Sequence, residues 1–156
     1  MIKNKIQFLL YDTYLTFIKK SAGSKMFQTI WAKVNGKKTD ITKNGELSCA
    51  IFVSTILHAF GLIKEMHTTV NGLTKDIIDS KWQKISKPKI GSVLIWEEIK
   101  FNDGPHKHIG FYVGNGIAIS NSLKTKVPAK HRWTYGKTNG KPNRKVIAIY
   151  HHPKLK

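Results

Sequence analysis

Hydrophobic positions follow two patterns along the chain, helical spacing in the first half and strand-like alternation in the second. In the first half, apolar residues recur every three or four positions. This spacing predicts four helices, over residues 3–20, 25–34, 49–60 and 69–80. In the second half, apolar runs predict a strand over 90–98, a hairpin over 108–122 that turns at 114–116, and a strand over 146–150.

The order of these elements predicts an α+β fold, in which N-terminal helices pack on a central antiparallel sheet. A chain of 156 residues can form one domain with a core of its own, so we expect a single domain over residues 1–156. Within it we expect a helical part (1–34), a central part (45–122), a long loop (123–145), and a last strand with a short tail (146–156).

The apolar segment 3–20 has the positive start of a signal peptide, but Asp12 interrupts it and no small-residue cleavage site follows. It is also too short and too charged to span a bilayer, so we expect no transmembrane segment. The preferred interpretation is a helix packed on the domain, and the alternative is a helix lying on a membrane surface. Secretion or attachment to a cell wall by another route stays open.

The only cysteine, Cys49, stands where the third predicted helix begins. Ser48 is a suitable N-cap, and Gly61 ends the apolar run that follows. Because the helix dipole and unpaired backbone N–H groups favour a thiolate in a first turn, the sequence predicts a lowered pKa for Cys49. The alternative is an inert cysteine that acts as a small buried hydrophobic residue. With one cysteine, no internal disulfide can form.

A second candidate, His108, opens the first strand of the predicted hairpin and follows a polar loop. A histidine in that place can point into a cleft, and thiol chemistry needs such a base, held by a third polar group. His106 and Asp103 lie nearby, so a metal site is an alternative. We expect no metal, because zinc sites need three or four convergent ligands and no such spacing occurs.

In their order along the chain, the segments SCAIFV (48–53), GSVLIW (91–96) and HIGFYVGNG (108–116) resemble the NlpC-type branch of the papain-like cysteine peptidases. These bacterial cell-wall hydrolases are related to the CHAP amidases, and the resemblance covers about residues 45–122. It implies a papain-like fold and cleavage of an amide bond in peptidoglycan peptides. It also implies Cys49 as the nucleophile, His108 as the base, and no cofactor.

The same resemblance implies a polar residue on the next strand that orients the histidine. The family commonly has a second histidine about twelve residues after the first, and Ser120 stands there. Asn121 follows, and its amide is the better orienter, so we favour it slightly. The two residues point to opposite faces of a strand, so only one can serve. The family usually has Asp before the cysteine and Ser after it, whereas Ser48 and Ala50 stand here.

Four further residues are candidate substrate-binding groups. Trp96 ends the strand over 90–98 and offers a flat wall, and His106 belongs to the loop at the mouth of the expected cleft. In the loop 123–145, Trp133 and Tyr135 stand among basic residues, a mixture that suits stacking on bases or sugar rings beside anionic groups.

Net charge adds an alternative function. The chain has 27 basic and 9 acidic residues, a net charge of +18, and no acidic residue follows Asp103. Such a field attracts polyanions, which include nucleic acid, teichoic acids and anionic lipid headgroups. The alternative to a hydrolase is therefore a non-enzymatic polyanion-binding protein on the same fold, that is, one that holds nucleic acid or an anionic wall polymer.

Overall fold

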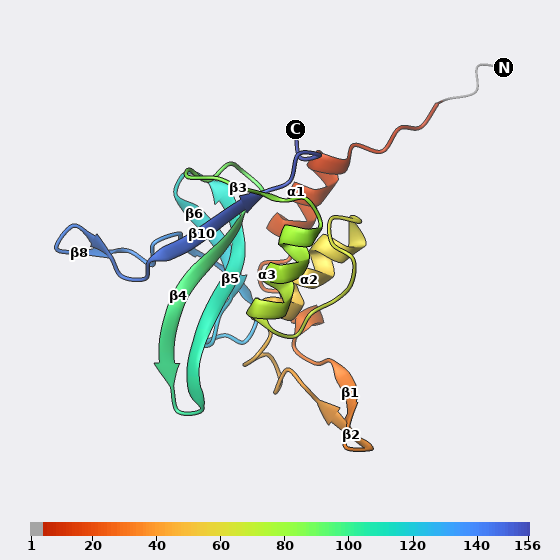
Figure 1. The fold of residues 1–156 in the computed structure, drawn as a ribbon, viewed down its shortest axis with the longest axis vertical. Helices are drawn as coiled ribbons and strands as arrows, with labels where there is room; N and C mark the ends of the chain where they lie inside the picture. Colours follow the sequence, from red (N-terminus) through yellow and green to blue (C-terminus); the bar gives the residue numbers. More distant parts are fainter. Residues whose placement is uncertain (1–4) are drawn as a thin grey trace.

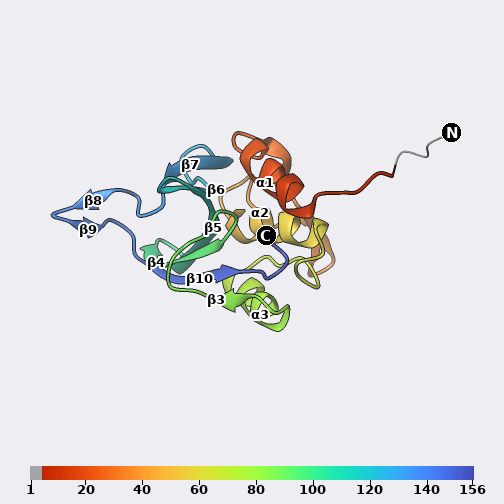
Figure 2. The ribbon, with the colours of Figure 1, turned by 90° about the horizontal axis from the view of Figure 1, so that it is seen from above.

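The computed structural model describes residues 5–156, which form a mixed α+β fold. Three helices, α1 (Leu10–Lys20), α2 (Cys49–Ala59) and α3 (Val70–Asp79), lie on one side of a six-stranded sheet (Figures 1 and 2). The predicted α+β class, with helices beside an antiparallel sheet, is confirmed. The predicted helices over 49–60 and 69–80 correspond to α2 and α3.

The sheet has the strand order β3-β10-β4-β5-β6-β7, and every neighbouring pair is antiparallel. β10 lies between β3 and β4, so the predicted last strand is interior, and the predicted hairpin over 108–122 forms the β5–β6 pair. The bounds are β3 (Gln83–Lys84), β4 (Val93–Phe101), β5 (Gly104–Gly114), β6 (Ile117–Asn121), β7 (Pro128–Arg132) and β10 (Val146–His151).

Two small hairpins extend from this body. The first joins β1 (Trp31–Val34) to β2 (Lys37–Asp40), and the second joins β8 (Lys137–Thr138) to β9 (Lys141–Pro142). The β8–β9 hairpin projects away from the sheet in both views (Figures 1 and 2).

Helix α2 is the centre of the main core. It is apolar around most of its circumference and contacts α1, α3, β5 and β6. Each large side chain that it buries completely, such as Phe52 or Leu57, contributes about 1.5–3 kcal/mol to the free energy of folding. The opposite face of the sheet is also covered, by a smaller cluster in which Leu94 and Trp96 pack under Trp133 and Tyr135. The strands beside α2 are therefore held from both faces.

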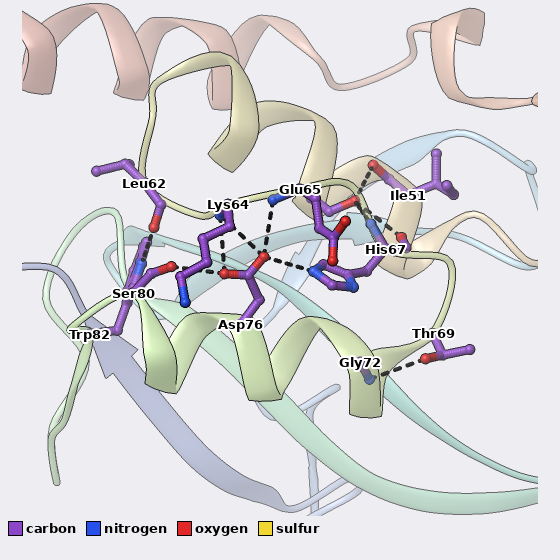
Figure 3. Close-up of polar contacts among 11 residues, drawn as sticks. Ile51, Leu62, Lys64, Glu65, His67, Thr69, Gly72, Asp76, Ser80 and Trp82 are labelled. Atoms are coloured by element: carbon purple, nitrogen blue, oxygen red, sulfur yellow. Dashed lines mark hydrogen bonds and ion pairs between the residues drawn. The ribbon is translucent and has the colours of Figure 1, made fainter.

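The connection between α2 and α3 is held by one buried carboxylate, Asp76 (Figure 3). It accepts hydrogen bonds from the backbone N–H groups of Lys64 and Glu65 and from the Ser80 hydroxyl, and its Oδ2 lies 2.7 Å from His67 Nε2. Burial raises the pKa of the Asp76 carboxyl, but the hydrogen bonds from His67, Lys64, Ser80 and Glu65 outweigh it and lower the pKa to about 2.

The predicted helix over 25–34 is wrong. Only Lys25–Phe27 form a helical turn, of the 3-10 type, and the chain then enters β1. Phe27 is buried, but Trp31 is 60% exposed, so the helical spacing of the apolar residues does not mark one buried face. Asn35 and Gly36 both have positive φ and turn the chain into β2, as an Asn-Gly pair does in tight hairpins.

Helix α1 is shorter than the predicted helix over 3–20. Residues 3 and 4 lie outside the described residues, and residues 5–9 are not helical. The helix begins at Leu10, where Asp12 stands in the first turn and Lys19 and Lys20 in the last, so the charges favour the helix dipole at both ends. None of the helices in the described part of the chain has the length and apolar character that crossing a bilayer requires.

The loop predicted around His106 is part of a long hairpin instead. β4 continues past Trp96 to Phe101, and β5 begins at Gly104, so Ile99 pairs with His106. The pairing shifts between Trp96 and Ile99, which is a β-bulge. Trp96 therefore does not end its strand, and His106 does not belong to a loop. The polar sequence of these arms concealed the strands because both arms are solvent-exposed beyond the bulge.

The segment 123–145 is only in part a loop. It contains β7, which extends the main sheet beside β6, and the β8–β9 hairpin. β7 is an edge strand, and edge strands carry charged side chains that discourage pairing with other chains. Its basic sequence therefore lacks the apolar alternation from which the other strands were predicted.

Candidate functional site

The site begins at Cys49, the first residue of α2. Its thiol faces the backbone N–H groups of Ala50, in the same helix, and of Ile109, in β5, which favour its deprotonated form. The second of these N–H groups belongs to the peptide that joins Ile109 to His108. The fold therefore brings Cys49 next to the backbone of His108, although the thiol and the imidazole make no direct hydrogen bond among the described contacts.

The start of α2 is fixed differently from the prediction. Ser48 does not cap the helix with its side chain. Its hydroxyl donates instead to the Phe27 carbonyl at 2.7 Å, and the Asn121 amide donates to the Gly45 carbonyl at 2.7 Å. These two buried bonds tie the segment before Cys49 to the helical turn behind it and to the end of β6. They position the thiol without touching it.

The predicted lowering of the Cys49 pKa is wrong in its net direction. Burial raises the pKa of the Cys49 thiol, and the N–H groups of Ala50 and Ile109 and the positive charge of Arg144 offset this only in part. Although Cys49 keeps some solvent exposure as a residue, its sulfur is closely surrounded by protein. The resting sulfur near pH 7 is therefore a thiol rather than a thiolate.

His108 is also neutral at rest. Burial, followed by the positive charges of Arg144 and His131, lowers the pKa of His108 to about 3. Its ring lies 5.4 Å from the ring of Trp96, centroid to centroid, and Trp96 is fully buried. A neutral imidazole is the form that can accept a proton from a thiol.

Ser120, not Asn121, meets His108. Ser120 Oγ lies 2.8 Å from His108 Nε2, and the two residues share one face of the β5–β6 pair. Gly110 lies between them, and a Cβ there would stand 2.6 Å from the Ser120 Cβ, so glycine is required for this close approach. Asn121 points to the other face, where it bonds Gly45, and the slight preference for Asn121 as the orienter is not supported.

Two further groups converge on Ser120 from the segment predicted as a loop. His131, in β7, places Nε2 at 2.7 Å from Ser120 Oγ, and the Tyr135 hydroxyl lies 3.2 Å from the same oxygen. The rings of His131 and Tyr135 are stacked at 4.1 Å. Sequence reasoning missed His131 because β7 was not recognised. Pairing of β7 with β6 puts His131 beside Ala118, on the face that Ser120 shares.

Arg144 is the second functional residue that sequence reasoning missed. It is buried, and its guanidinium donates to the backbone carbonyls of Glu97, which lies in the β-bulge, and of His106, which pairs with Ile99 after it. In the described part of the chain no carboxylate lies within ion-pair distance of Arg144. Its positive charge acts on Cys49 and His108 together, because it lowers the pKa of both. Because Arg144 belongs to no recognisable sequence motif, its position near Cys49 and His108 is evident only from the fold.

The remaining predicted substrate-binding residues lie at different depths. Trp96 is fully buried, and its indole N–H donates to the Trp133 carbonyl at 2.7 Å, so it is a wall behind His108 rather than an exposed surface. His106 stands on β5, where it contacts Asp103 at 2.9 Å. A surface hollow of about 330 Å³ adjoins the site on the β7 side and is lined by Trp133, with Arg132, Thr134, Lys137, Gly116 and Gly136.

A larger hollow, of about 450 Å³, lies away from the thiol, between α3 and β10, and includes Lys75 and Tyr150. We attach the chemistry to the Cys49 region rather than to this hollow, because the larger hollow holds no cysteine or histidine. Within residues 5–156, no three His, Cys, Asp or Glu side chains gather as a metal ion would require.

Neither the protein-family models nor the curated protein sequences contain a match to this chain.

Proposed function

We propose that the protein is a cysteine hydrolase on a papain-like fold of the NlpC type, which cleaves an amide bond in peptidoglycan peptides. One observation carries the proposal: the Cys49 thiol, at the start of a buried helix, lies against the Ile109 N–H, beside a histidine whose Nε2 is held by Ser120. A nucleophile, a base and a group that orients the base are the parts that this chemistry needs.

The reaction begins from a neutral pair. As Cys49 Sγ attacks the carbonyl carbon, its proton passes to His108 Nδ1, and the carbonyl oxygen becomes an oxyanion near the Cys49 backbone N–H. His108 then gives this proton to the leaving amine as the C–N bond breaks, and an acyl-enzyme thioester remains. Water attacks the thioester carbonyl and loses a proton to His108; as the C–S bond breaks, His108 returns this proton to the Cys49 sulfur, which releases the carboxylic acid and restores the thiol.

Arg144 favours the charge that develops on sulfur. A positive charge close to a thiol stabilises its deprotonated form, and Arg144 lowers the pKa of Cys49 in this way. The same charge disfavours a protonated His108. The proposed mechanism is therefore proton transfer during attack, and not attack by a thiolate that exists beforehand.

The basic surface has a place in this proposal. With a net charge of +18, the protein would be attracted to an anionic wall polymer such as a teichoic acid, which concentrates it near its substrate. The hollow beside Trp133 adds two cations, Arg132 and Lys137, next to an aromatic ring.

The second candidate function is non-enzymatic binding of a polyanion. It is favoured by the raised pKa of Cys49, which an inert buried cysteine would also show, and by the hollow beside Trp133. In this case the ligand would be nucleic acid or an anionic wall polymer, and Cys49 would take no part.

A cleavage assay on purified peptidoglycan distinguishes the hydrolase from the binding protein. Wild-type protein should release soluble peptide fragments with new amino groups, detected by chromatography and mass spectrometry, whereas Cys49→Ala should release none. His58→Ala is the matched control, because His58 is exposed on the same helix and far from the thiol. If wild type and Cys49→Ala both leave peptidoglycan intact but bind teichoic acid or nucleic acid in a salt-sensitive way, the binding function replaces the hydrolase.

A further inference from the structure

Three polar side chains, His108, His131 and Tyr135, converge on the Ser120 hydroxyl at one face of the sheet. Ser120 is 1% exposed, so bulk water does not compete for these bonds. A hydroxyl has one proton to donate and two lone pairs that accept. With three partners around it, the directions of two bonds follow once the bond that uses the hydroxyl proton is known.

The bond whose direction is known joins His131 to the backbone of Arg132. His131 Nδ1 lies 2.8 Å from the backbone carbonyl oxygen of Arg132, and a carbonyl oxygen can only accept. His131 Nδ1 must therefore carry a hydrogen. Burial lowers the pKa of His131, so the ring is neutral at pH 7 and its other nitrogen, Nε2, is a pure acceptor.

Because His131 Nε2 can only accept, the Ser120 hydroxyl must donate its proton to it. His131 Nε2 lies 2.7 Å from Ser120 Oγ, and the only hydrogen available between them is the one on the hydroxyl. Ser120 then has no proton left for its other partners and must accept from both. His108 Nε2, at 2.8 Å, is therefore protonated, and the Tyr135 hydroxyl, at 3.2 Å, is a donor. This arrangement uses the full bonding capacity of Ser120.

We propose that His131 is a positioning residue that sets the tautomer of His108 through Ser120. A neutral histidine with its hydrogen on Nε2 has a free lone pair on Nδ1. That nitrogen is the one that can accept the Cys49 proton, since Ser120 occupies the other. The residue that orients the base is thus a serine whose own direction is set by a second histidine on the neighbouring strand. The catalytic meaning of this tautomer rests on the proposed hydrolase function.

The opposite arrangement is excluded by the same bonds. If Ser120 donated to His108, the lone pairs of Ser120 Oγ and His131 Nε2 would face each other at 2.7 Å without a proton. Leaving a buried acceptor without its donor is unfavourable. Removal of the acceptor on His131 lifts this penalty, and Ser120 is then free to donate to His108 and move the hydrogen of His108 to Nδ1.

Nitrogen-15 NMR of the imidazole groups measures the tautomers directly in the intact protein, without any substrate. We expect the neutral tautomer with hydrogen on Nε2 for His108 and the one with hydrogen on Nδ1 for His131. A spectrum with the hydrogen of His108 on Nδ1 would overturn the inference. Since this result does not depend on peptidoglycan, it can fail while wall cleavage is observed, or hold while cleavage is absent.

Two variants test the effect on Cys49. His131→Phe keeps a flat ring against Tyr135 but removes the acceptor, and His131→Gln keeps an acceptor. We expect alkylation of Cys49 by iodoacetamide at pH 7 to slow at least about tenfold in His131→Phe and to recover in part in His131→Gln. His58→Phe, on the exposed side of α2, is the control and should react like wild type. Equal rates in wild type and a folded His131→Phe would contradict the proposal.

Discussion

His67 and His108 are both held by polar side chains, and their surroundings differ. His67 contacts the carboxylate of Asp76 at 2.7 Å, and backbone N–H groups and Ser80 also bond that carboxylate (Figure 3). His108 has no carboxylate and meets only the Ser120 hydroxyl, yet its backbone adjoins the Cys49 thiol.

The contact of His67 stabilises the fold, whereas the contact of His108 would orient a base under the proposed function. The charged Asp76 holds the α2–α3 connection through backbone N–H groups, His67 and the Ser80 hydroxyl, and no thiol is among these partners. The polar groups around His108 are neutral, and the positive charge of Arg144 acts on both the thiol and the imidazole. A strong histidine–carboxylate contact is thus a poor guide to catalysis here. What distinguishes His108 is the Cys49 thiol beside its backbone.

Removing each histidine in turn should give the largest difference in the rate of peptide release. His108→Ala should lower the rate of peptide release from peptidoglycan by about 10²–10⁴-fold, because the base is lost. His67→Ala should leave the rate of the folded enzyme unchanged, although it weakens the α2–α3 connection. Chromatographic assays on the two purified variants measure both rates. An equal loss of rate in both variants would show that His108 has no special role in cleavage.

Asp76→Asn should produce the largest change in stability. The Asp76 pKa is lowered to about 2 in the folded chain, so the charged carboxylate stabilises the fold by roughly 2 kcal/mol at pH 7. This contribution is complete above the unfolded value near 4 and disappears as the pH falls through about 2. Urea unfolding of wild type and Asp76→Asn should therefore differ at pH 7 and converge toward pH 2. A difference that does not depend on pH would contradict this origin.

Ser120→Ala and Asn121→Ala should separate the two faces of β6. Loss of the Ser120 hydroxyl removes one buried bond to His108 and should slow amide cleavage about tenfold. Asn121→Ala removes the bond to the Gly45 carbonyl and should cost about 1 kcal/mol of stability, with a smaller effect on rate. Rates and urea midpoints measured on both variants test this. A slower Asn121→Ala than Ser120→Ala would restore Asn121 as the orienter.

Arg144→Met should give the smallest change, a several-fold slower alkylation of Cys49 at pH 7. Without the positive charge, the pKa of the thiol should rise further and that of His108 should rise toward its ordinary value. Arg144→Lys keeps the charge and should lie between Arg144→Met and wild type. Alkylation followed by mass spectrometry measures all three proteins, and faster reaction in Arg144→Met would show that the charge does not assist the sulfur.

Where apolar spacing and burial agree, the sequence was sufficient to predict the fold. Helix α2 and the β5–β6 pair were predicted because their apolar residues are buried in the main core. The helix expected over 25–34 failed because Trp31 and Val34 are exposed on a hairpin, and the Asn35-Gly36 turn signal was the better guide. β7 was missed because a basic edge strand lacks the alternation of a half-buried strand.

The candidate site was predictable only as far as local motifs reach. Cys49 stands at the start of α2, as predicted, whereas His108 lies within β5 and does not open it; the two residue types alone indicate thiol chemistry. The contribution of His131 and Arg144 depends on how β7 and the segment before β10 fold over the sheet, which no local pattern contains. The pKa of Cys49 was predicted in the wrong direction because burial, which depends on tertiary packing, outweighs the N–H groups at the start of the helix.

The most direct test of the Cys49–His108 pair is the rate of Cys49 alkylation by iodoacetamide between pH 4 and pH 10, in wild type and in His108→Ala. Because the neutral His108 can accept the proton during attack, wild type should react measurably below pH 7, and this part of the profile should vanish in His108→Ala. The variant should retain only the rise of an ordinary or buried thiol, near pH 8.5 or above. The same profile in both proteins would contradict the pair and the hydrolase built on it.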